Sequence, residues 1–171
     1  MRILPAIALS LALAAPALAE APEPKKPVDP ARFTGRWYEV ARLPSPYQKG
    51  CFGSTFDWVR TKEGGLDVVV ACRVGSPTGK SKVQRGKATV LDPKTNARLR
   101  VSFMGGLASA EYRVLDRADD YSWVLLGTSG GKYMWVLSNR PKLAEPLREQ
   151  AIARAASLGY AVNKLIQAPD E

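Results

Sequence analysis

The sequence predicts an all-β fold, either an antiparallel sandwich or an up-and-down barrel, with one α-helix near the C-terminus. Three observations carry this expectation. Eight short segments rich in β-branched and aromatic residues follow one another, joined by turns of a few residues. Apolar and polar residues alternate within several of these segments, which is the period of a half-buried strand. Only residues 144–158 show the longer period of a helix.

The first nineteen residues are expected to be a signal peptide. Arg2 precedes the apolar run 3–13, and Ala17-Leu18-Ala19 gives a small-x-small cleavage pattern. A retained membrane anchor is the alternative, but this run is too short to span about 30 Å of hydrocarbon. A lipoprotein signal would need a cysteine at the cleavage site, and none precedes Cys51. We therefore predict a periplasmic or secreted protein that is soluble after cleavage.

Residues 20–32 are expected to form a flexible arm ahead of the barrel domain, residues 33–168. The arm has four prolines between positions 21 and 30, together with charges of both signs. It leads into the first strand, Phe33–Arg42. Gly35 suits a tight entry to this strand, and Trp37 has the apolar area to plug one end of a core.

Seven further strands are expected at short spacing. They are predicted at residues 55–60, 66–73, 86–91, 97–103, 110–116, 121–126 and 132–138. Alternation assigns their faces, so that Leu99 and Val101 point inward while Arg98 and Arg100 point to solvent. An eight-stranded barrel either fills its interior with side chains or leaves room for one small ligand. The small residues on the inward faces favour a cavity, although a filled core could use them too.

Residues 144–158 predict one amphipathic helix packed on the outside of the sheet. Pro146 lies early in it, where its missing N–H costs nothing, and Gly159 provides the stop. The apolar face consists of Leu147, Ala151, Ala155 and Leu158. A short apolar run at 164–167 is expected to add a last strand.

The composition excludes several classes of chemistry. The chain has no histidine, which removes the commonest metal ligand and the usual proton shuttle, so we expect no metal and no cofactor. Two cysteines in an exported chain favour a disulfide between Cys51 and Cys72, closing a loop of about 20 residues. The alternative is a redox or nucleophilic thiol, for which the chain has no activating histidine.

The charge balance bears on the partners. Loss of the signal peptide removes Arg2 and leaves 152 residues with a net charge of +8. For an exported chain this favours peripheral contact with an anionic membrane surface rather than nucleic acid. The alternative is a solvated basic surface with no specific partner. A monomer or a homodimer is expected.

Four segments, in order, resemble signatures of the lipocalin family, and of its bacterial branch in particular. The first is Gly35–Arg42, where the family's glycine-x-tryptophan closes the narrow end of a barrel. The others are Leu99–Gly106, Tyr112–Tyr121 and Tyr133–Pro141. The likeness covers residues 33–167. It implies an eight-stranded antiparallel up-and-down β-barrel, a calyx open at one end, with one C-terminal α-helix packed outside.

The resemblance also implies a function: holding and carrying a small hydrophobic ligand such as a fatty acid or lysophospholipid, in membrane lipid storage, transport or maintenance. Each buried methylene contributes about 0.8 kcal/mol, so a long acyl chain needs few polar contacts. We expect about half of the inward residues to pack the core instead, especially near Trp37. The predicted wall residues are Val68, Val70, Ala88, Val90, Leu99, Val101, Phe103, Tyr112, Val114, Tyr133 and Trp135.

Glu39 is an outlier among these positions, because alternation places this carboxylate on the inward face with Trp37 and Ala41. A buried carboxylate needs a partner. We expect an interior arginine or tyrosine to pair with it; the alternative is contact with a polar ligand head group.

The sequence departs from the family pattern after the last barrel strand. The family places an arginine across the buried tryptophan, a cation–π contact. Here the aligned position is Asn139, and Arg140 follows one residue later. Either a backbone shift lets Arg140 cover Trp37, or Asn139 caps that end by hydrogen bonds; the first is preferred. The loop 104–109 has small residues where the family often has aromatics, which predicts a more open mouth.

Two other classes of function compete with a lipid carrier. An enzyme built on the barrel would need an unpaired cysteine, or an acid and a base facing the cavity. A Cys51–Cys72 bridge would leave only Glu39 and the tyrosines, so we expect no catalytic residues. A protein-binding scaffold would instead have a filled barrel and use its loop surface.

Overall fold

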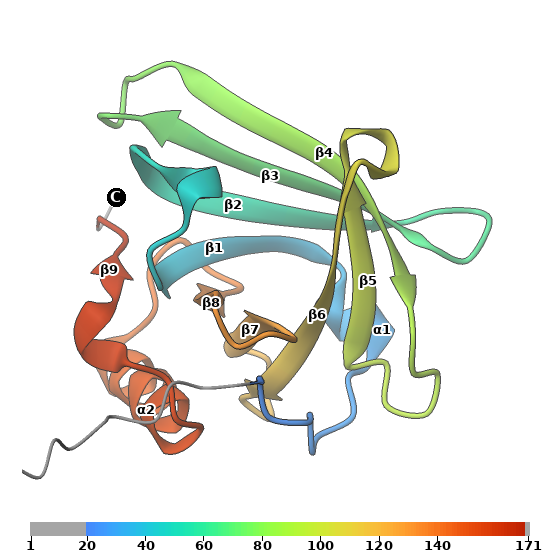
Figure 1. The fold of residues 1–171 in the computed structure, drawn as a ribbon. Helices are drawn as coiled ribbons and strands as arrows, with labels where there is room; N and C mark the ends of the chain where they lie inside the picture. Colours follow the sequence, from blue (N-terminus) through green and yellow to red (C-terminus); the bar gives the residue numbers. More distant parts are fainter. Residues whose placement is uncertain (1–19, 170–171) are drawn as a thin grey trace, which may run out of the picture.

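The barrel in the computed structural model, which describes residues 20–169, is a single antiparallel sheet wrapped around an apolar interior (Figure 1). The strand order is β2-β3-β4-β5-β6-β7-β8-β1-β9, and an additional β2–β1 pairing closes the barrel. The strands are β1 (Gly35–Arg42), β2 (Cys51–Arg60), β3 (Leu66–Val74), β4 (Ser81–Val90), β5 (Arg98–Phe103), β6 (Ala108–Arg117), β7 (Trp123–Thr128), β8 (Met134–Ser138) and β9 (Ile166–Gln167). The predicted eight-stranded up-and-down barrel with a short last strand is confirmed.

Two α-helices and three 3₁₀ turns complete the described chain. They are α1 (Pro30–Phe33), α2 (Glu145–Ser157), η1 (Pro46–Gln48), η2 (Met104–Gly106) and η3 (Val162–Lys164). Neither α-helix has the length and hydropathy of a membrane-spanning helix.

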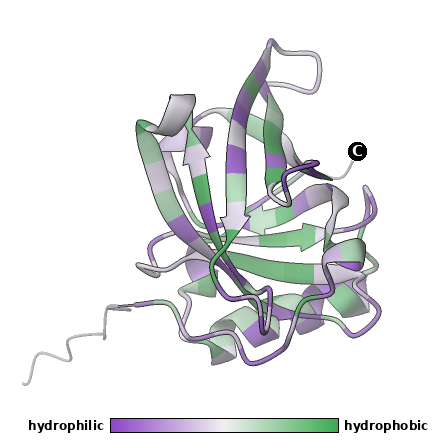
Figure 2. Cartoon of the chain, turned by 90° about the vertical axis from the view of Figure 1, so that its right-hand side faces the viewer, coloured by the Kyte–Doolittle hydropathy of each residue, from purple (hydrophilic) through white to green (hydrophobic). Residues whose placement is uncertain are grey.

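β2 and β4 begin earlier than predicted, at Cys51 and Ser81 rather than at residues 55 and 86. The Gly-, Ser- and Lys-rich composition of these starts is typical of loops. β3 nevertheless pairs with both extensions, with Cys51 opposite Val74 and Arg73 opposite Ser81. Ladder hydrogen bonds to β3 thus override the weak local preference. Hydrophilic and hydrophobic bands alternate along the long strands in Figure 2, as expected for strands with one face toward solvent and one toward the barrel interior.

Apolar residues form two separate cores, one on each side of the sheet. The inner core lies inside the barrel and includes Trp37, Trp58, Val68, Leu99 and Val114. The outer core lies under α2 and includes Leu125, Val136, Ala151 and Ala155. Leu147 and Leu158 pack against the outer core, so all four residues of the predicted apolar helix face contact it. The predicted position of the helix outside the barrel is confirmed.

β1 contains an irregularity that changes which face its residues occupy. Its register with β8 shifts between Glu39 and Ala41. As a result Val40 and Ala41 both join the outer core, and Arg42 returns beside Glu39. The expectation that Ala41 shares the inward face with Glu39 is therefore wrong, because a bulge adds one residue and reverses the alternation beyond it.

The closed end of the barrel is sealed by α1. Asp29 caps this turn by accepting a hydrogen bond from the backbone N–H of Ala31, and Pro30 occupies its first position. Phe33 is thereby placed against Trp37 and Trp58, with ring centroids 6.1 and 5.2 Å away. The Trp37 indole N–H donates to the Phe33 carbonyl at 2.8 Å. Trp37 is 1% exposed and plugs the closed end of the barrel, as predicted.

Gly35 opens β1 at φ +110°, a conformation that L side chains rarely adopt. Nothing lies within 4 Å of an added Cβ, so the backbone angle rather than space requires glycine here. This gives the predicted tight entry a specific physical basis.

Arg140 does not reach Trp37. Its side chain is exposed, and the cation–π contacts among residues 20–169 do not include this pair. Asn139 is exposed as well. Cation–π contacts at the closed end involve Tyr121 instead, with the guanidinium groups of Arg32 and Arg117 at 4.3 and 4.4 Å from its ring centroid. The preferred role of Arg140 is corrected: Phe33, brought in by α1, covers the tryptophan.

The arm expected to be flexible is bound to the barrel. Ala21 and Val28 are each 3% exposed, and their backbone N–H groups donate to Ser129 and Thr95 carbonyls at 2.7 Å. The buried Arg113 guanidinium donates to the Ala21 carbonyl at 2.6 Å and to the Glu20 carboxylate at 2.8 Å. These partners outweigh the proline-rich composition, so the expectation of disorder in this segment is corrected.

Candidate ligand-binding site

The open end of the barrel contains a cavity of about 490 Å³. This volume lies within the range of small-molecule sites. Its walls are the inward faces of β2 to β8, and the loop carrying η1 lies at one side. The lining residues are Tyr47, Gln48, Phe56, Val70, Val83, Gln84, Arg85, Val101, Phe103, Met104, Ala108, Ser109, Ala110, Tyr112, Thr128, Tyr133 and Trp135. The barrel is therefore hollow rather than filled.

Aromatic residues form the floor of the cavity. Trp135 lies 6.0 Å from Phe56 in an edge contact and 5.8 Å from Tyr112 in a stacked one, measured between ring centroids. Tyr133 packs beside Trp135, and Tyr47 meets the edge of Tyr133. Below this layer lies the inner core around Trp37, so the tryptophan at the closed end is separated from the ligand site.

The predicted wall residues divide between the cavity and the core beneath it. Six line the cavity: Val70, Val101, Phe103, Tyr112, Tyr133 and Trp135. Val68, Ala88, Leu99 and Val114 are at most 2% exposed and belong to the inner core. Val90 packs against that core at the closed end, opposite Leu99. Alternation identifies the inward face but not the depth at which side chains stop filling it.

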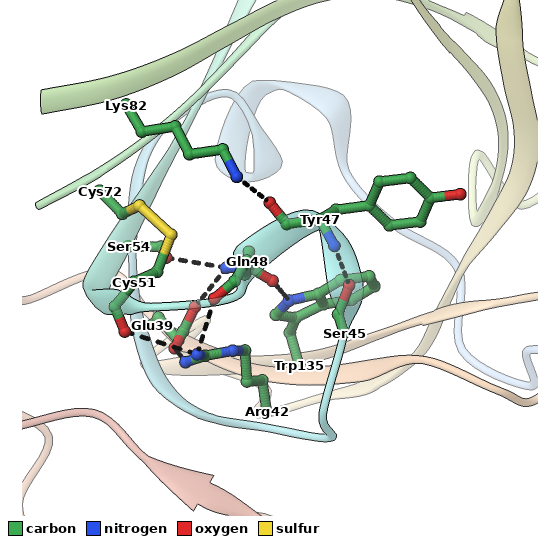
Figure 3. The surroundings of a disulfide bond; sticks show 10 residues. All are labelled: Glu39, Arg42, Ser45, Tyr47, Gln48, Cys51, Ser54, Cys72, Lys82 and Trp135. Atoms are coloured by element: carbon green, nitrogen blue, oxygen red, sulfur yellow. Dashed lines mark hydrogen bonds and ion pairs between the residues drawn. A yellow bond between two sulfur atoms is a disulfide. The ribbon is translucent and has the colours of Figure 1, made fainter. Parts of the chain in front are cut away.

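Glu39 belongs to a buried polar cluster with Arg42, Ser54 and Gln48 (Figure 3), of which Gln48 lines the cavity. It forms an ion pair with Arg42, and the exposed fractions of the two side chains are 0% and 5%. Gln48 Nε2 donates to Glu39 Oε2 at 2.7 Å and to Ser54 Oγ at 2.8 Å. The predicted pairing of Glu39 with an interior arginine is confirmed, and this carboxylate does not line the cavity.

Gln48 joins this cluster to the cavity floor. Its Oε1 accepts a hydrogen bond from the Trp135 indole N–H at 2.6 Å. Sequence reasoning missed Gln48 because it lies in a loop, where no periodicity assigns a side chain to the interior. The extension of β4 similarly hid Val83, Gln84 and Arg85, whereas the alternation of Phe56 with Trp58 in β2 could have identified Phe56.

The loop that carries Gln48 is fixed at several points (Figure 3). Ser45 caps η1 by accepting from the Tyr47 backbone N–H at 3.3 Å. Lys82 Nζ donates to the Tyr47 carbonyl at 2.8 Å, which ties the loop to β4. The predicted disulfide is confirmed, and it joins Cys51 at the end of the loop to Cys72 of β3. Both cysteines of the chain are thus used, and no free thiol is available for catalysis.

The polar groups at the cavity suit a neutral or anionic ligand end. Burial, with the neighbouring Tyr47 and Tyr133, raises the pKa of Tyr112 to about 12, so its hydroxyl stays protonated at neutral pH. Arg85 and Gln84 line the mouth, and no aspartate or glutamate is among the lining residues. No group of three or more potential metal ligands occurs within residues 20–169.

The match to a lipocalin-like domain model extends over residues 28–170, nearly the whole described chain. The chain belongs to the lipocalin family. Outer membrane lipoprotein Blc from Citrobacter freundii is 30% identical, covering 97% of this chain and 96% of the relative. Temperature-induced lipocalin-1 from Arabidopsis thaliana is 30% identical, covering 81% of this chain and 77% of the relative.

Solved structures share the fold at low sequence identity. Insecticyanin from the tobacco hornworm Manduca sexta has a TM-score of 0.69 and 16% identity, covering 92% of this chain and 87% of that one. Lobster apocrustacyanin A1 has a TM-score of 0.65 and 14% identity, covering 90% and 92%. The overall fold of this chain is therefore shared with these solved structures.

Proposed function

We propose that this lipocalin holds one apolar lipid chain, of a fatty acid, lysophospholipid or similar lipid, and carries it between membranes. The observation that carries the proposal is the 490 Å³ cavity with its aliphatic and aromatic walls. Transfer of an acyl chain from water into such walls contributes about 0.8 kcal/mol per methylene. Arg85, Gln84 and the tyrosine hydroxyls at the mouth would meet the polar end of the lipid.

The test combines extraction and direct binding. Organic extraction of the purified protein followed by lipid mass spectrometry is expected to release an acyl lipid, and the stripped protein should bind a fluorescent fatty acid. Val70→Trp, which places a bulky indole in the cavity and narrows it, should weaken that binding. Val69→Trp is the matched control, because Val69 is the adjacent residue of β3 and does not line the cavity. A barrel that yields no lipid and binds no fluorescent fatty acid would refute the carrier.

The carrier is proposed to act after export, in the periplasm or outside the cell. The apolar segment before Ala19, with no cysteine ahead of Cys51, supports release without an attached lipid. The Blc relatives differ by name, being outer membrane lipoproteins. Edman sequencing of the exported protein should begin at Glu20. Its partition into the detergent phase of Triton X-114 would indicate a lipid anchor instead.

A further inference from the structure

The rim of the cavity has an unusual charge distribution. The rim is defined here as residues 43–50, 73–85, 104–109 and 129–133, which form the four connections at the open end and the adjoining strand ends. It contains six positively charged residues and neither aspartate nor glutamate. The six are Lys49, Arg73, Lys80, Lys82, Arg85 and Lys132. No residue of the rim itself therefore neutralises the charge of these cations.

Large apolar side chains stand among these cations. Leu107 is 90% exposed, Met104 67% and Tyr47 58%. Met104 is the first residue of η2, and Leu107 follows this turn directly. η2 lies at the top of β5 and β6 in Figure 1. A leucine exposed to this extent at a turn tip contributes nothing to packing in the isolated barrel, and apolar side chains beside cations are typical of surfaces that contact lipid.

The opposite end of the barrel is different. The connections there, residues 61–65, 91–97, 118–122 and 139–144, carry four carboxylates and four cations, so their net charge is zero. The carboxylates are Glu63, Asp92, Asp119 and Asp120, and the cations are Lys62, Lys94, Arg140 and Lys142. Cations beside these connections are paired with carboxylates. Lys26 Nζ lies 3.5 Å from Asp116 and 3.2 Å from Asp119, and Arg117 lies 3.6 Å from Asp119. The net positive charge of the chain is therefore concentrated at the end where the cavity opens.

We propose that the rim is a docking surface for an anionic phospholipid bilayer, with Leu107 and Met104 entering the interface and the cations contacting head groups. This orientation places the mouth of the cavity against the membrane, so that an acyl chain passes between bilayer and barrel without crossing water. The inference rests on the proposed carrier function and adds the partner and the face that meets it. An acidic protein would match the charges, but it would leave Leu107 without an apolar environment.

The test measures binding to vesicles of phosphatidylcholine alone and of phosphatidylcholine with phosphatidylglycerol, by flotation at low and high salt. Each charge removed is expected to weaken binding to the anionic vesicles about fivefold, so Lys49→Gln/Lys80→Gln/Lys132→Gln should weaken it on the order of a hundredfold. The matched control at other surfaces is Lys62→Gln/Lys94→Gln/Arg140→Gln, three exposed cations outside the rim. It should weaken binding only a fewfold.

A second pair of variants tests the apolar tip. Leu107→Ser should weaken binding to the same vesicles about tenfold, on the basis of its lost apolar area. Leu91→Ser is the control, since Leu91 is 37% exposed and lies at the closed end, after β4. Wild-type binding should also fall as salt rises, because screening shortens the reach of the cations.

The outcomes separate docking from ligand binding. Equal binding to neutral and anionic vesicles, or equal losses in the rim and control variants, would overturn the docking surface. The rim variant is expected to bind fluorescent fatty acid as tightly as wild type, because Lys49, Lys80 and Lys132 do not line the cavity. Vesicle binding by a protein that takes up no fatty acid would refute the carrier and leave the docking surface standing.

Discussion

Gln48 and Trp135 connect the loop beside the cavity to the cavity floor through one hydrogen bond, from the indole N–H to Gln48 Oε1 at 2.6 Å. Trp135 belongs to β8 and Gln48 to η1, two elements far apart in the sequence. The same Gln48 amide also donates to Glu39 and Ser54. A single side chain therefore fixes the loop, the buried ion pair and the floor relative to one another.

Replacing Gln48 should lower the free energy of unfolding of the protein. Gln48→Leu leaves the Trp135 N–H and a Glu39 oxygen without this partner, and each buried group left unsatisfied costs about 1–3 kcal/mol. We expect a loss of about 2–5 kcal/mol in the free energy of unfolding, measured in urea. Gln84→Leu is the control, because Gln84 also lines the cavity but its side chain has no hydrogen-bond partner within residues 20–169. Equal losses in the two variants would show that the Gln48 hydrogen bonds contribute nothing specific.

The Glu39–Arg42 ion pair is expected to couple strongly. Removal of one partner from a buried pair costs about 3–5 kcal/mol because the other charge is left uncompensated. Glu39→Leu and Arg42→Leu should each destabilise the fold by about this amount. The double variant should lose clearly less than the sum of the two. A double-mutant cycle in urea measures the difference, and simple additivity would contradict the pairing.

Trp37 and Arg140 should respond very differently to substitution. Trp37→Ala removes a buried indole from the closed end and is expected to cost about 3–5 kcal/mol in the free energy of unfolding. Arg140→Gln should change it by less than about 0.5 kcal/mol, as is usual for an exposed residue without special contacts. Thermal unfolding distinguishes the two. A large loss in the arginine variant would mean that Arg140 does support the closed end.

Stability should fall in acid partly through Asp116. Burial alone would raise the pKa of this carboxylate, but the Arg117 backbone N–H and the Arg154 guanidinium outweigh it and hold the pKa below its usual value. A pKa depressed in the folded state contributes stability above the unfolded pKa, near 4, which is lost as the pH falls through the folded one.

Asp116→Asn should therefore cost about 1–3 kcal/mol at pH 7, and its difference from wild type should shrink between pH 4 and pH 2. Urea unfolding over this range provides the measurement. Asp119→Asn is the control, since the side chain of Asp119 is 90% exposed. A constant difference across the pH range would exclude Asp116 as a source of acid sensitivity.

The sequence predicts most of the fold because the strands and the helix have clear periods. The alternation in β5 defines its two faces without any tertiary information, with Leu99 and Val101 on one face and Arg98 and Arg100 on the other. The bulge after Glu39 is different, since nothing in the local sequence indicates that Val40 and Ala41 both face the outer core. It depends on the pairing with β8, and register is a property of two strands rather than one.

The site is less predictable than the fold for a similar reason. Val70 and Val68 have the same residue type and share an inward face, yet one lines the cavity and the other packs the inner core. The depth of the aromatic layer around Trp135 decides between them. That layer is assembled from β2, β6 and β8, so no single strand specifies it.

Arg85 should select ligands by the charge of their polar end. It lines the cavity mouth, where no carboxylate competes for it, and it is exposed, so an ion pair with a ligand carboxylate is worth at most about 1 kcal/mol. Arg85→Gln should therefore weaken binding of a long-chain fatty acid about two- to fivefold. Binding of the fatty alcohol with the same chain length should not change, because an uncharged end gains nothing from the guanidinium.

Lys87→Gln is the control on the same strand, away from the cavity lining. Isothermal titration calorimetry of the acid and the alcohol with wild type, Arg85→Gln and Lys87→Gln gives the comparison. If Arg85→Gln lost affinity equally for the acid and the alcohol, Arg85 would shape the mouth rather than recognise charge.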